Sequence, residues 1–533
     1  MGPFRVIRTM LLFHIFFNII FFNSQQVNTK DGPINGIAQK TISGKTYYAF
    51  YSIPYAKPPV GTRRYQPPEL TDPWTEPYDG RVEKPIICYQ VWSDSEQENE
   101  DCLYMNVFTP VDPSEAVNSS LPVMVNIHGG GFIAGSGLES GGFSPKYLIE
   151  EDILVVSFNY RLGAFGFLST GDDIIPGNLG LKDQILALKW VQRNIAAFGG
   201  DSTKVTISGQ SAGAASVGYL VISPAAKGLF AGAILESGTS LCPWAYQRNQ
   251  TKNTFKTDVS GADAVYQLST QQGFIYAPVI EDTSNDSAIS QFQYESLTQG
   301  NINKVPILIG VCSEEGLMNL DDNIDFTMNS YDTQPGYLVP QDLHIDYGTK
   351  EWNEVGNLIK QEYSPLSTFA NNKAAGIKYF TEHDFVKAAT KFAELASTFT
   401  DVYFYQFSYS GPIGFNTNHK YPGTGNVTHV EEWGYLYWGY SISEFPSEDQ
   451  LMHNRMVALF TNFVKFQVPT PAKDPLFDNI VWPKVTNETF QYLNIGNFSD
   501  ITLSVVNEKP KADRMTFWDN IYEKYGLSPF DTY

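Results

Sequence analysis

The sequence predicts an α/β fold in which a mostly parallel central sheet is covered by helices. Two observations support this class. Short, continuously apolar runs alternate with amphipathic helical patterns along the chain, and such runs are typical of parallel strands buried on both faces. In addition, the β-branched run 205–208 is followed at once by a glycine-flanked serine and a helical pattern, which indicates a sharp strand-to-helix turn.

The expected elements follow one another in a regular order. Strands are expected at 123–127, 153–158, 205–208, 231–235, 305–310 and 402–407. Helices are expected at 181–198, where Gly199 and Gly200 give a stop signal, and at 212–220. The stretch 321–381 is rich in Asn, Asp, Tyr and Gly, and we expect a helical and loop insertion that caps the sheet and shapes a pocket.

The N-terminus has the features of a secretory signal peptide. Arg5 and Arg8 precede an apolar run over 10–22, and this run is short for a membrane span. We therefore expect a signal peptide at 1–24, a single domain at 25–533 and a secreted protein. The alternative is a retained signal anchor.

The charge balance limits the partners that the chain can have. A net charge of −21 over 533 residues disfavours nucleic acid and anionic lipid surfaces. No second hydrophobic segment reaches spanning length, and the last nine residues do not form a lipid-anchor signal, so no membrane anchor is expected.

Cysteines and sequons also fit secretion. Cys88 and Cys102 bracket an acidic loop and are expected to form a disulfide, whereas Cys242 and Cys312 lie in apolar surroundings and are expected to stay free, with their pairing as the alternative. The sequons expected to carry glycans are Asn118, Asn249, Asn285, Asn487 and Asn497.

The serine in the strand-to-helix turn is the first candidate for chemistry. Ser211 is the centre of the G-x-S-x-G pentapeptide 209–213, which is typical of a strained turn that exposes a nucleophilic hydroxyl. This motif predicts acyl transfer through a serine. It is weak alone, but the strand before it and the helix after it are the required context.

An oxyanion-binding loop is expected directly after the strand 123–127. The sequence HGGGF at 128–132 lets backbone N–H groups converge without obstruction by side chains. The expected donors are Gly130 and Gly131, with Ala212 as the third. A structural turn is the weaker alternative.

A base and an orienting acid should follow the serine in the chain. The histidines after it are His344, His383, His419, His429 and His453. His429, in a glycine-containing loop before an aromatic-rich helix, is favoured and His419 is its competitor. The acid is expected after the strand 305–310, where composition leaves Glu314 and Glu315 open.

Several ordered motifs resemble the type-B carboxylesterase/cholinesterase family, from about residue 32 to about residue 524. They are EDCLYMN at 100–106, HGGGF at 128–132, NYRLG at 159–163, GNLGLKDQ at 177–184, GGD at 199–201, the pentapeptide at 209–213 and ESG at 236–238. The resemblance implies an α/β-hydrolase fold with cap insertions over the active site and hydrolysis of small-molecule carboxylic esters.

The resemblance also assigns site residues. It implies Glu315 as the acid and His429 as the base. Asn426 stands where a glycine is usual in the family and is part of a sequon three residues from the base, so we expect it to be unmodified. Ser237 resembles a supporting serine near the acid. Glu100 and Arg161 resemble a buried structural ion pair.

Two positions bear on the substrate. Gln210 stands where cholinesterases have glutamate and resembles insect carboxylesterases, including juvenile hormone esterase-like members, which favours small or medium apolar esters. Trp92 matches the tryptophan that stacks on choline in cholinesterases, but a packing role is favoured because the disulfide loop is short. No cofactor or metal is implied. A catalytically silent adhesion or binding protein on the same fold is the competing interpretation.

Overall fold

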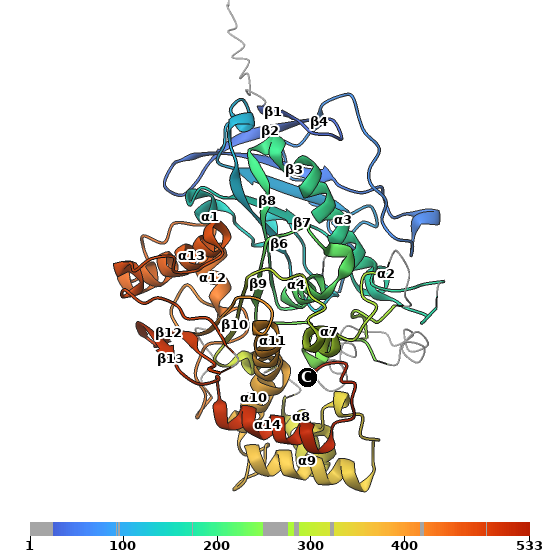
Figure 1. The fold of residues 1–533 in the computed structure, drawn as a ribbon, viewed down its shortest axis with the longest axis vertical. Helices are drawn as coiled ribbons and strands as arrows, with labels where there is room; N and C mark the ends of the chain where they lie inside the picture. Colours follow the sequence, from blue (N-terminus) through green and yellow to red (C-terminus); the bar gives the residue numbers. More distant parts are fainter. Residues whose placement is uncertain are drawn as a thin grey trace, which may run out of the picture.

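A single mixed sheet runs through the part of the chain that the computed structural model describes. The described residues are 25–533, apart from 92, 94–95, 173, 249–274, 282–286, 320–323, 416–420 and 487. The sheet has 13 strands in the order β1-β2-β3-β5-β7-β6-β8-β9-β10-β11-β12-β13, with β4 paired to β2 (Figure 1). Its strands are β1 (Gln25–Asn28), β2 (Pro33–Lys40), β3 (Thr46–Pro54), β4 (Tyr78–Asp79), β5 (Tyr104–Thr109), β6 (Leu121–Ile127), β7 (Leu154–Phe158), β8 (Gly200–Gln210), β9 (Gly232–Glu236), β10 (Ile307–Cys312), β11 (Val402–Tyr409), β12 (Tyr492–Phe498) and β13 (Asp500–Val506).

The middle of the sheet is parallel and both of its ends are antiparallel. Strands β7, β6, β8, β9, β10, β11 and β12 form successive parallel pairs. The expected strands are all found there, which confirms the α/β class. The antiparallel strands β1, β2, β3, β5 and β13 were not identified from the sequence. Strands β1, β2 and β13 are partly exposed and β5 contains the polar Asn106, whereas β3 is a buried run rich in aromatic residues that the sequence analysis did not single out.

Helices cover both faces of the sheet (Figure 1). Val123 and Val125 of β6 pack on one face with residues of α3, α4 and α11, whereas Met124 faces the opposite side with residues of α1, α12 and α13. The helices are α1 (Lys146–Glu150), α2 (Gly163–Phe167), α3 (Leu179–Asn194), α4 (Ala212–Ile222), α7 (Gln293–Gln299), α8 (Ile324–Thr333), α9 (Lys350–Tyr363), α10 (Lys373–Phe380), α11 (Lys387–Ser397), α12 (Glu431–Tyr437), α13 (Ser447–Phe466) and α14 (Ala512–Tyr525).

The helix expected at 181–198 differs slightly from the observed one. Helix α3 begins at Leu179 and ends at Asn194, and a 3-10 turn continues it to Phe198. Gly199 then adopts a left-handed conformation with φ 86°, which ends the turn as its stop signal predicts. The tighter last turn satisfies carbonyls that an α-helix end leaves open.

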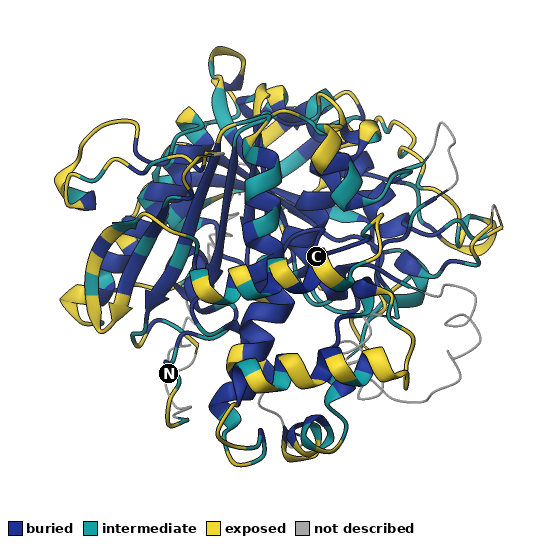
Figure 2. Ribbon diagram, turned by 60° about the horizontal axis from the view of Figure 1, so that its bottom comes forward, coloured by how far each residue is buried: buried dark blue, intermediate teal, exposed yellow. Residues whose placement is uncertain are grey.

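The insertion expected over 321–381 contains α8, α9 and α10, as predicted. Helix α9 buries Trp352, Val355 and Ile359 on one face, and the side chain of Thr349 accepts a hydrogen bond from the Trp352 N–H at its start. The insertion meets the sheet directly after β10, where Gly316 N donates to Thr381 Oγ1 at 2.9 Å. Figure 2 shows the central strands of the sheet buried, with exposed residues along the outer faces of helices and on strands at the edge of the sheet.

The segment expected to be a signal peptide, 1–24, lies outside the described residues. Among the residues that are described, none of the helices combines the length and the apolar composition that a membrane crossing needs.

Candidate active site

Ser211 forms the strained turn that the pentapeptide predicts. It lies between β8 and α4, with φ 57° and ψ −123°, a conformation that L-residues rarely adopt. The strand and the helix approach each other closely at this turn. A Cβ on Gly209 would lie only 2.4 Å from the carbonyl carbon of Gly213. Only glycine fits there, and the tight turn lifts the serine out of the sheet edge.

The glycine loop lies beside this serine because β6 and β8 are parallel neighbours. Ile127 at the end of β6 is in register with Gly209 of β8. A Cβ on Gly129 would lie 3.2 Å from Ser211 Cβ, so the loop contacts the turn. Gly130 has φ 105° and no room for a side chain, since a Cβ would meet the Ala134 carbonyl oxygen at 2.2 Å. The loop is thus held by its glycines next to the Ser211 side chain.

Glu315 and His429 are joined by a short, buried hydrogen bond. Nδ1 of His429 lies 2.6 Å from Glu315 Oε2, and the two residues are 5% and 0% exposed. Glu315 follows β10, and its Oε1 accepts the Cys312 N–H at 2.7 Å. The carboxylate of the neighbouring Glu314 points to another group, since it accepts a hydrogen bond from the Val427 N–H at 3.3 Å. The geometry therefore pairs Glu315 with His429.

The other ring nitrogen of His429 faces the serine turn. Its Nε2 lies 3.1 Å from the side-chain amide nitrogen of Gln210, the residue before Ser211. The structure thus brings Ser211, Glu315 and His429 to one edge of the sheet, from the ends of β8 and β10 and the loop before α12.

The other described histidines that follow Ser211 in the chain do not lie in this arrangement. His383 pairs with Asp384 at 2.6 Å. His344 lies 3.8 Å from Asp531. His453 packs on Tyr147, and burial lowers its pKa to about 4. His419, the competitor for the base, lies outside the described residues.

Aromatic side chains cover one side of the imidazole. The ring centroid of Phe385 lies 4.7 Å from that of His429. Phe385 packs on Trp244 at 5.8 Å, and Trp244 packs on Phe132 of the glycine loop at 6.5 Å. Trp244 Nε1 donates to the Asp384 carbonyl oxygen at 2.8 Å. These rings form an apolar wall next to the candidate site.

Two buried carboxyl groups lie behind the Glu315–His429 pair, and sequence reasoning missed both. Burial raises the pKa of Glu432, and the charge of Glu315 raises it further. Burial and the charge of Glu432 raise the pKa of Glu236 to about 8. Two sequence features could have indicated these carboxyl groups: the ESG motif for Glu236, and the position of Glu432 three residues after His429. Ser237 donates to Glu432 Oε1 at 3.1 Å, so this serine contacts Glu432 rather than Glu315.

The expected ion pair between Glu100 and Arg161 is wrong. Arg161 binds Asp183 of α3 through two hydrogen bonds of 2.8 and 2.7 Å, and both residues are buried. Glu100 is only partly buried and pairs with Arg64. The fully buried carboxylate of Asp183 is the nearer and less solvated partner for a buried guanidinium.

The cysteine predictions are confirmed. Cys88 and Cys102 form a disulfide, and Cys242 and Cys312 are free and buried. Burial raises the pKa of Cys242 to about 12. The sulfur of Cys312 lies 2.7 Å from Glu432 Oε2.

The sequons stay predictions. Asn118 and Asn497 are exposed, and Asn426 is half-buried in the loop before His429. Asn249, Asn285, Asn487 and Trp92 lie outside the described residues.

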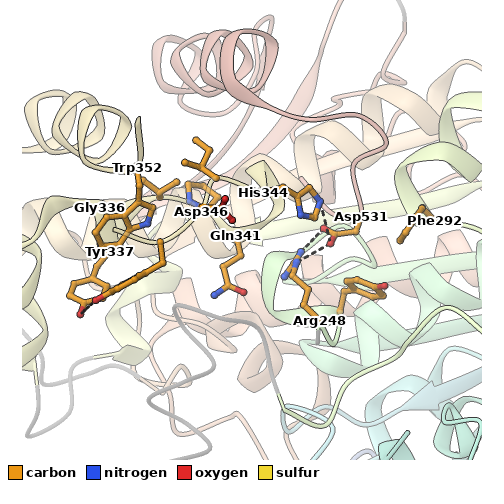
Figure 3. Close-up of a pocket in the computed structure, with 14 residues that line it drawn as sticks. Arg248, Phe292, Gly336, Tyr337, Gln341, His344, Asp346, Trp352 and Asp531 are labelled. Carbon is orange, nitrogen blue, oxygen red and sulfur yellow. Dashed lines mark hydrogen bonds and ion pairs between the residues drawn. The ribbon is translucent and has the colours of Figure 1, made fainter. Parts of the chain in front are cut away.

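A separate cavity of about 700 Å³ opens beside the cap. Figure 3 shows the aromatic side chains of Tyr337 and Trp352 on one side and the ion pair of Arg248 with Asp531 on the other. Neither Ser211 nor His429 lines it, so this cavity is not the candidate active site.

The comparisons with known proteins agree with the geometry. The model of the carboxylesterase family matches residues 23–262 and 256–518. Juvenile hormone esterase of Tribolium castaneum is 31% identical over 92% of this chain and 93% of its own length. Pyrethroid hydrolase Ces2a of Mus musculus is 31% identical over 92% of this chain and 90% of its own length.

A solved structure is similar over nearly the whole fold. Juvenile hormone esterase from Manduca sexta, with OTFP covalently attached, has a TM-score of 0.79 and 27% identity, and the match covers 94% of this chain and 100% of that one. The fold and the comparisons define a carboxylic-ester hydrolase with the α/β-hydrolase fold. The chain belongs to the carboxylesterase family. The family match and the similarity to an esterase with a covalently attached compound favour an enzyme over a catalytically silent binding protein.

Proposed function

We propose that the chain is a secreted serine carboxylesterase that acts through an acyl-enzyme on small or medium apolar esters. The observation that carries the proposal is the 2.6 Å hydrogen bond between His429 Nδ1 and Glu315 Oε2. It fixes the imidazole so that Nε2 faces the turn that bears Ser211. A nucleophile, a base and an orienting acid are the groups that serine acyl transfer needs.

In the acylation step, Ser211 Oγ attacks the ester carbonyl carbon while its proton passes to His429 Nε2. Glu315 keeps the Nδ1 hydrogen in place and stabilises the imidazolium. The backbone N–H groups of Gly130, Gly131 and Ala212 bind the oxyanion. His429 then gives the proton to the alcohol oxygen, which leaves as the bond to the carbonyl carbon breaks.

Deacylation repeats these roles with water. His429 Nε2 takes a proton from water, whose oxygen attacks the acyl carbon, and the proton then goes to Ser211 Oγ as the acid product leaves. The wall of Phe132, Trp244 and Phe385 supports an apolar acyl or alcohol group, because burial of apolar surface is favourable there.

The test is hydrolysis of a short-chain nitrophenyl ester by the wild-type protein and by Ser211→Ala. We expect turnover to fall by at least about 10³-fold in the variant. Ser330→Ala is the matched control, because this serine lies in α8 of the cap and its hydroxyl donates to the Thr327 carbonyl oxygen of the same helix. Equal turnover by wild type and Ser211→Ala contradicts the mechanism.

The substrate class and secretion need separate measurements. We expect kcat/KM to rise as the acyl chain of the nitrophenyl ester lengthens from acetyl toward medium length, and a fall along this series contradicts the apolar preference. N-terminal sequencing of protein secreted from eukaryotic cells should show cleavage near residue 24, and protein retained in membranes contradicts it.

A further inference from the structure

The side chain of Gln210 connects the base to the glycine loop. Its amide nitrogen lies 3.1 Å from His429 Nε2. Its amide oxygen lies against Gly129, where a Cβ would be 3.0 Å away. Gln210 is also the residue directly before Ser211, at the end of β8. Its amide group therefore lies where the proposed proton transfer takes place.

The direction of the Gln210–His429 bond follows from the other side of the ring. The Glu315 carboxylate can only accept, so Nδ1 of His429 carries the hydrogen. A neutral imidazole carries one hydrogen, and Nε2 therefore offers its single lone pair as an acceptor. The Gln210 amide donates an N–H to that lone pair.

This bond occupies the atom that the proposed mechanism needs. Proton transfer from Ser211 requires the same Nε2 lone pair, which can accept only one hydrogen in good geometry. Two consecutive residues, Gln210 and Ser211, thus carry donors for a single acceptor. Among the hydrogen bonds of the described residues, His429 Nε2 is matched with Gln210 and not with the serine hydroxyl.

We propose that Gln210 is a positioning residue that holds His429 Nε2 in the resting enzyme and must release it before Ser211 can be activated. We call this N–H···Nε2 bond the Gln210 latch. The inference rests on the proposed serine mechanism and adds a step to it. Binding of an ester at Ser211 favours the serine–imidazole bond, and the glutamine amide turns away from the ring.

A neutral amide is suited to this role and a carboxylate is not. The charged groups that face the imidazole are Glu315, which bonds it directly, and Glu432, which acts through its charge. From the π-helical turn Thr381–Val386, the ring of Phe385 packs on the imidazole, whereas Glu382 of this turn pairs with Arg514, and His383 pairs with Asp384. Another carboxylate at position 210 cannot donate to neutral imidazole and stabilises imidazolium instead.

The first test is Gln210→Met, which keeps the side-chain length and removes the donor. We expect the acylation rate constant, measured from the pre-steady-state burst with a short-chain nitrophenyl ester, to rise about fivefold, because one hydrogen bond no longer competes. The dissociation constant of the ester should stay unchanged. Gln192→Met is the matched control, because the side-chain amide of Gln192, on α3, donates to the backbone oxygens of Ser202 and Leu229 away from the candidate site.

The second test is Gln210→Glu, followed through the pH profile of kcat/KM. We expect the acidic limb of Gln210→Glu to move to higher pH, and that of Gln210→Met to move the same way by a smaller amount, because loss of a donor to the neutral ring favours imidazolium. A role in packing alone lowers activity in both variants and leaves the acidic limb of Gln210→Met at the wild-type position. If the methionine variant does not fold, as judged by its melting curve, Gln210→Leu takes its place.

The outcomes separate this inference from the proposed function. A burst that survives in Ser211→Ala contradicts the serine mechanism itself. A burst that disappears in Ser211→Ala, together with wild-type or slower acylation by Gln210→Met, overturns the latch and leaves the mechanism standing. Faster acylation by Gln210→Met, with its acidic limb moved to higher pH, supports the latch.

Discussion

Phe385 packs its ring against the imidazole of His429, with centroids 4.7 Å apart. It does so from a π-helical turn, Thr381–Val386, which lies between α10 and α11. Such turns contain one more residue per hydrogen-bonded ring than an α-helix and often occur at functional sites. The wider turn directs Phe385 toward the candidate base.

We expect Phe385→Leu to lower kcat about tenfold, because a tilted imidazole no longer aligns Nε2 with the serine. Phe392→Leu is the control, since Phe392 is fully buried in α11 and its loss affects packing alone. Kinetics and melting temperatures should be measured for both variants. A similar fall of kcat in both contradicts a specific role for Phe385.

Glu315→Gln should nearly abolish activity. Its amide cannot hold the Nδ1 hydrogen as a carboxylate does, and we expect kcat to fall about 10³- to 10⁴-fold. Glu314→Gln is a matched control, because the neighbouring carboxylate bonds the Val427 N–H rather than the imidazole. Steady-state kinetics with a nitrophenyl ester distinguish them, and equal losses contradict the assignment of the acid.

Glu236 makes the stability of the fold depend on pH. Its folded-state pKa of about 8 lies above the ordinary value of 4.5, because the carboxyl group is fully buried. Folding therefore favours the protonated group, and this contribution is complete below about pH 4.5 and is lost as the pH rises toward about 8. In that range the free energy of unfolding should fall by up to about 1.4 kcal/mol per pH unit.

Urea unfolding at several pH values tests the role of Glu236. Glu236→Gln is neutral at every pH, so its free energy of unfolding should change less between these limits than that of the wild type. Parallel pH dependence in the two proteins rules out a neutral, buried Glu236.

The disulfide should contribute to stability. Cys88 and Cys102 are 14 residues apart, and closing a loop of this size stabilises the folded state by about 3 kcal/mol. Cys88→Ser/Cys102→Ser should lower the free energy of unfolding by this amount. A reductant should destabilise the wild type and leave the double variant unchanged, and an equal response of both proteins contradicts this account.

Much of the fold could be predicted because the central strands have a simple pattern. Runs such as 123–127 are apolar except for Asn126 and are fully buried, since parallel strands are buried on both faces. The antiparallel strands at the two ends were missed because β2 alternates buried and partly exposed residues and β13 is largely exposed. Local sequence also could not show that α3 ends in a 3-10 turn.

The candidate site was predicted where motifs are contiguous in sequence. The serine turn and the glycine loop are local patterns, and the structure brings Ser211 and Gly129 into contact as they imply. The pairing of Glu315 with His429 joins residues 114 positions apart, and composition alone left Glu314 open. The Gln210 contact depends on a side-chain rotamer, which no motif specifies.

The parallel register of β6 and β8 and the position of β10 have a consequence for how activity relates to folding. Ile127 is in register with Gly209, and Glu315 follows a strand that joins the sheet one position beyond β9. A contiguous fragment that lacks β6, β8, β9 or β10 cannot hold the nucleophile, the glycine loop and the acid in one place. Ester turnover therefore reports that these four strands are assembled, and a nick or local opening near β10 should abolish activity while the serine turn is still intact.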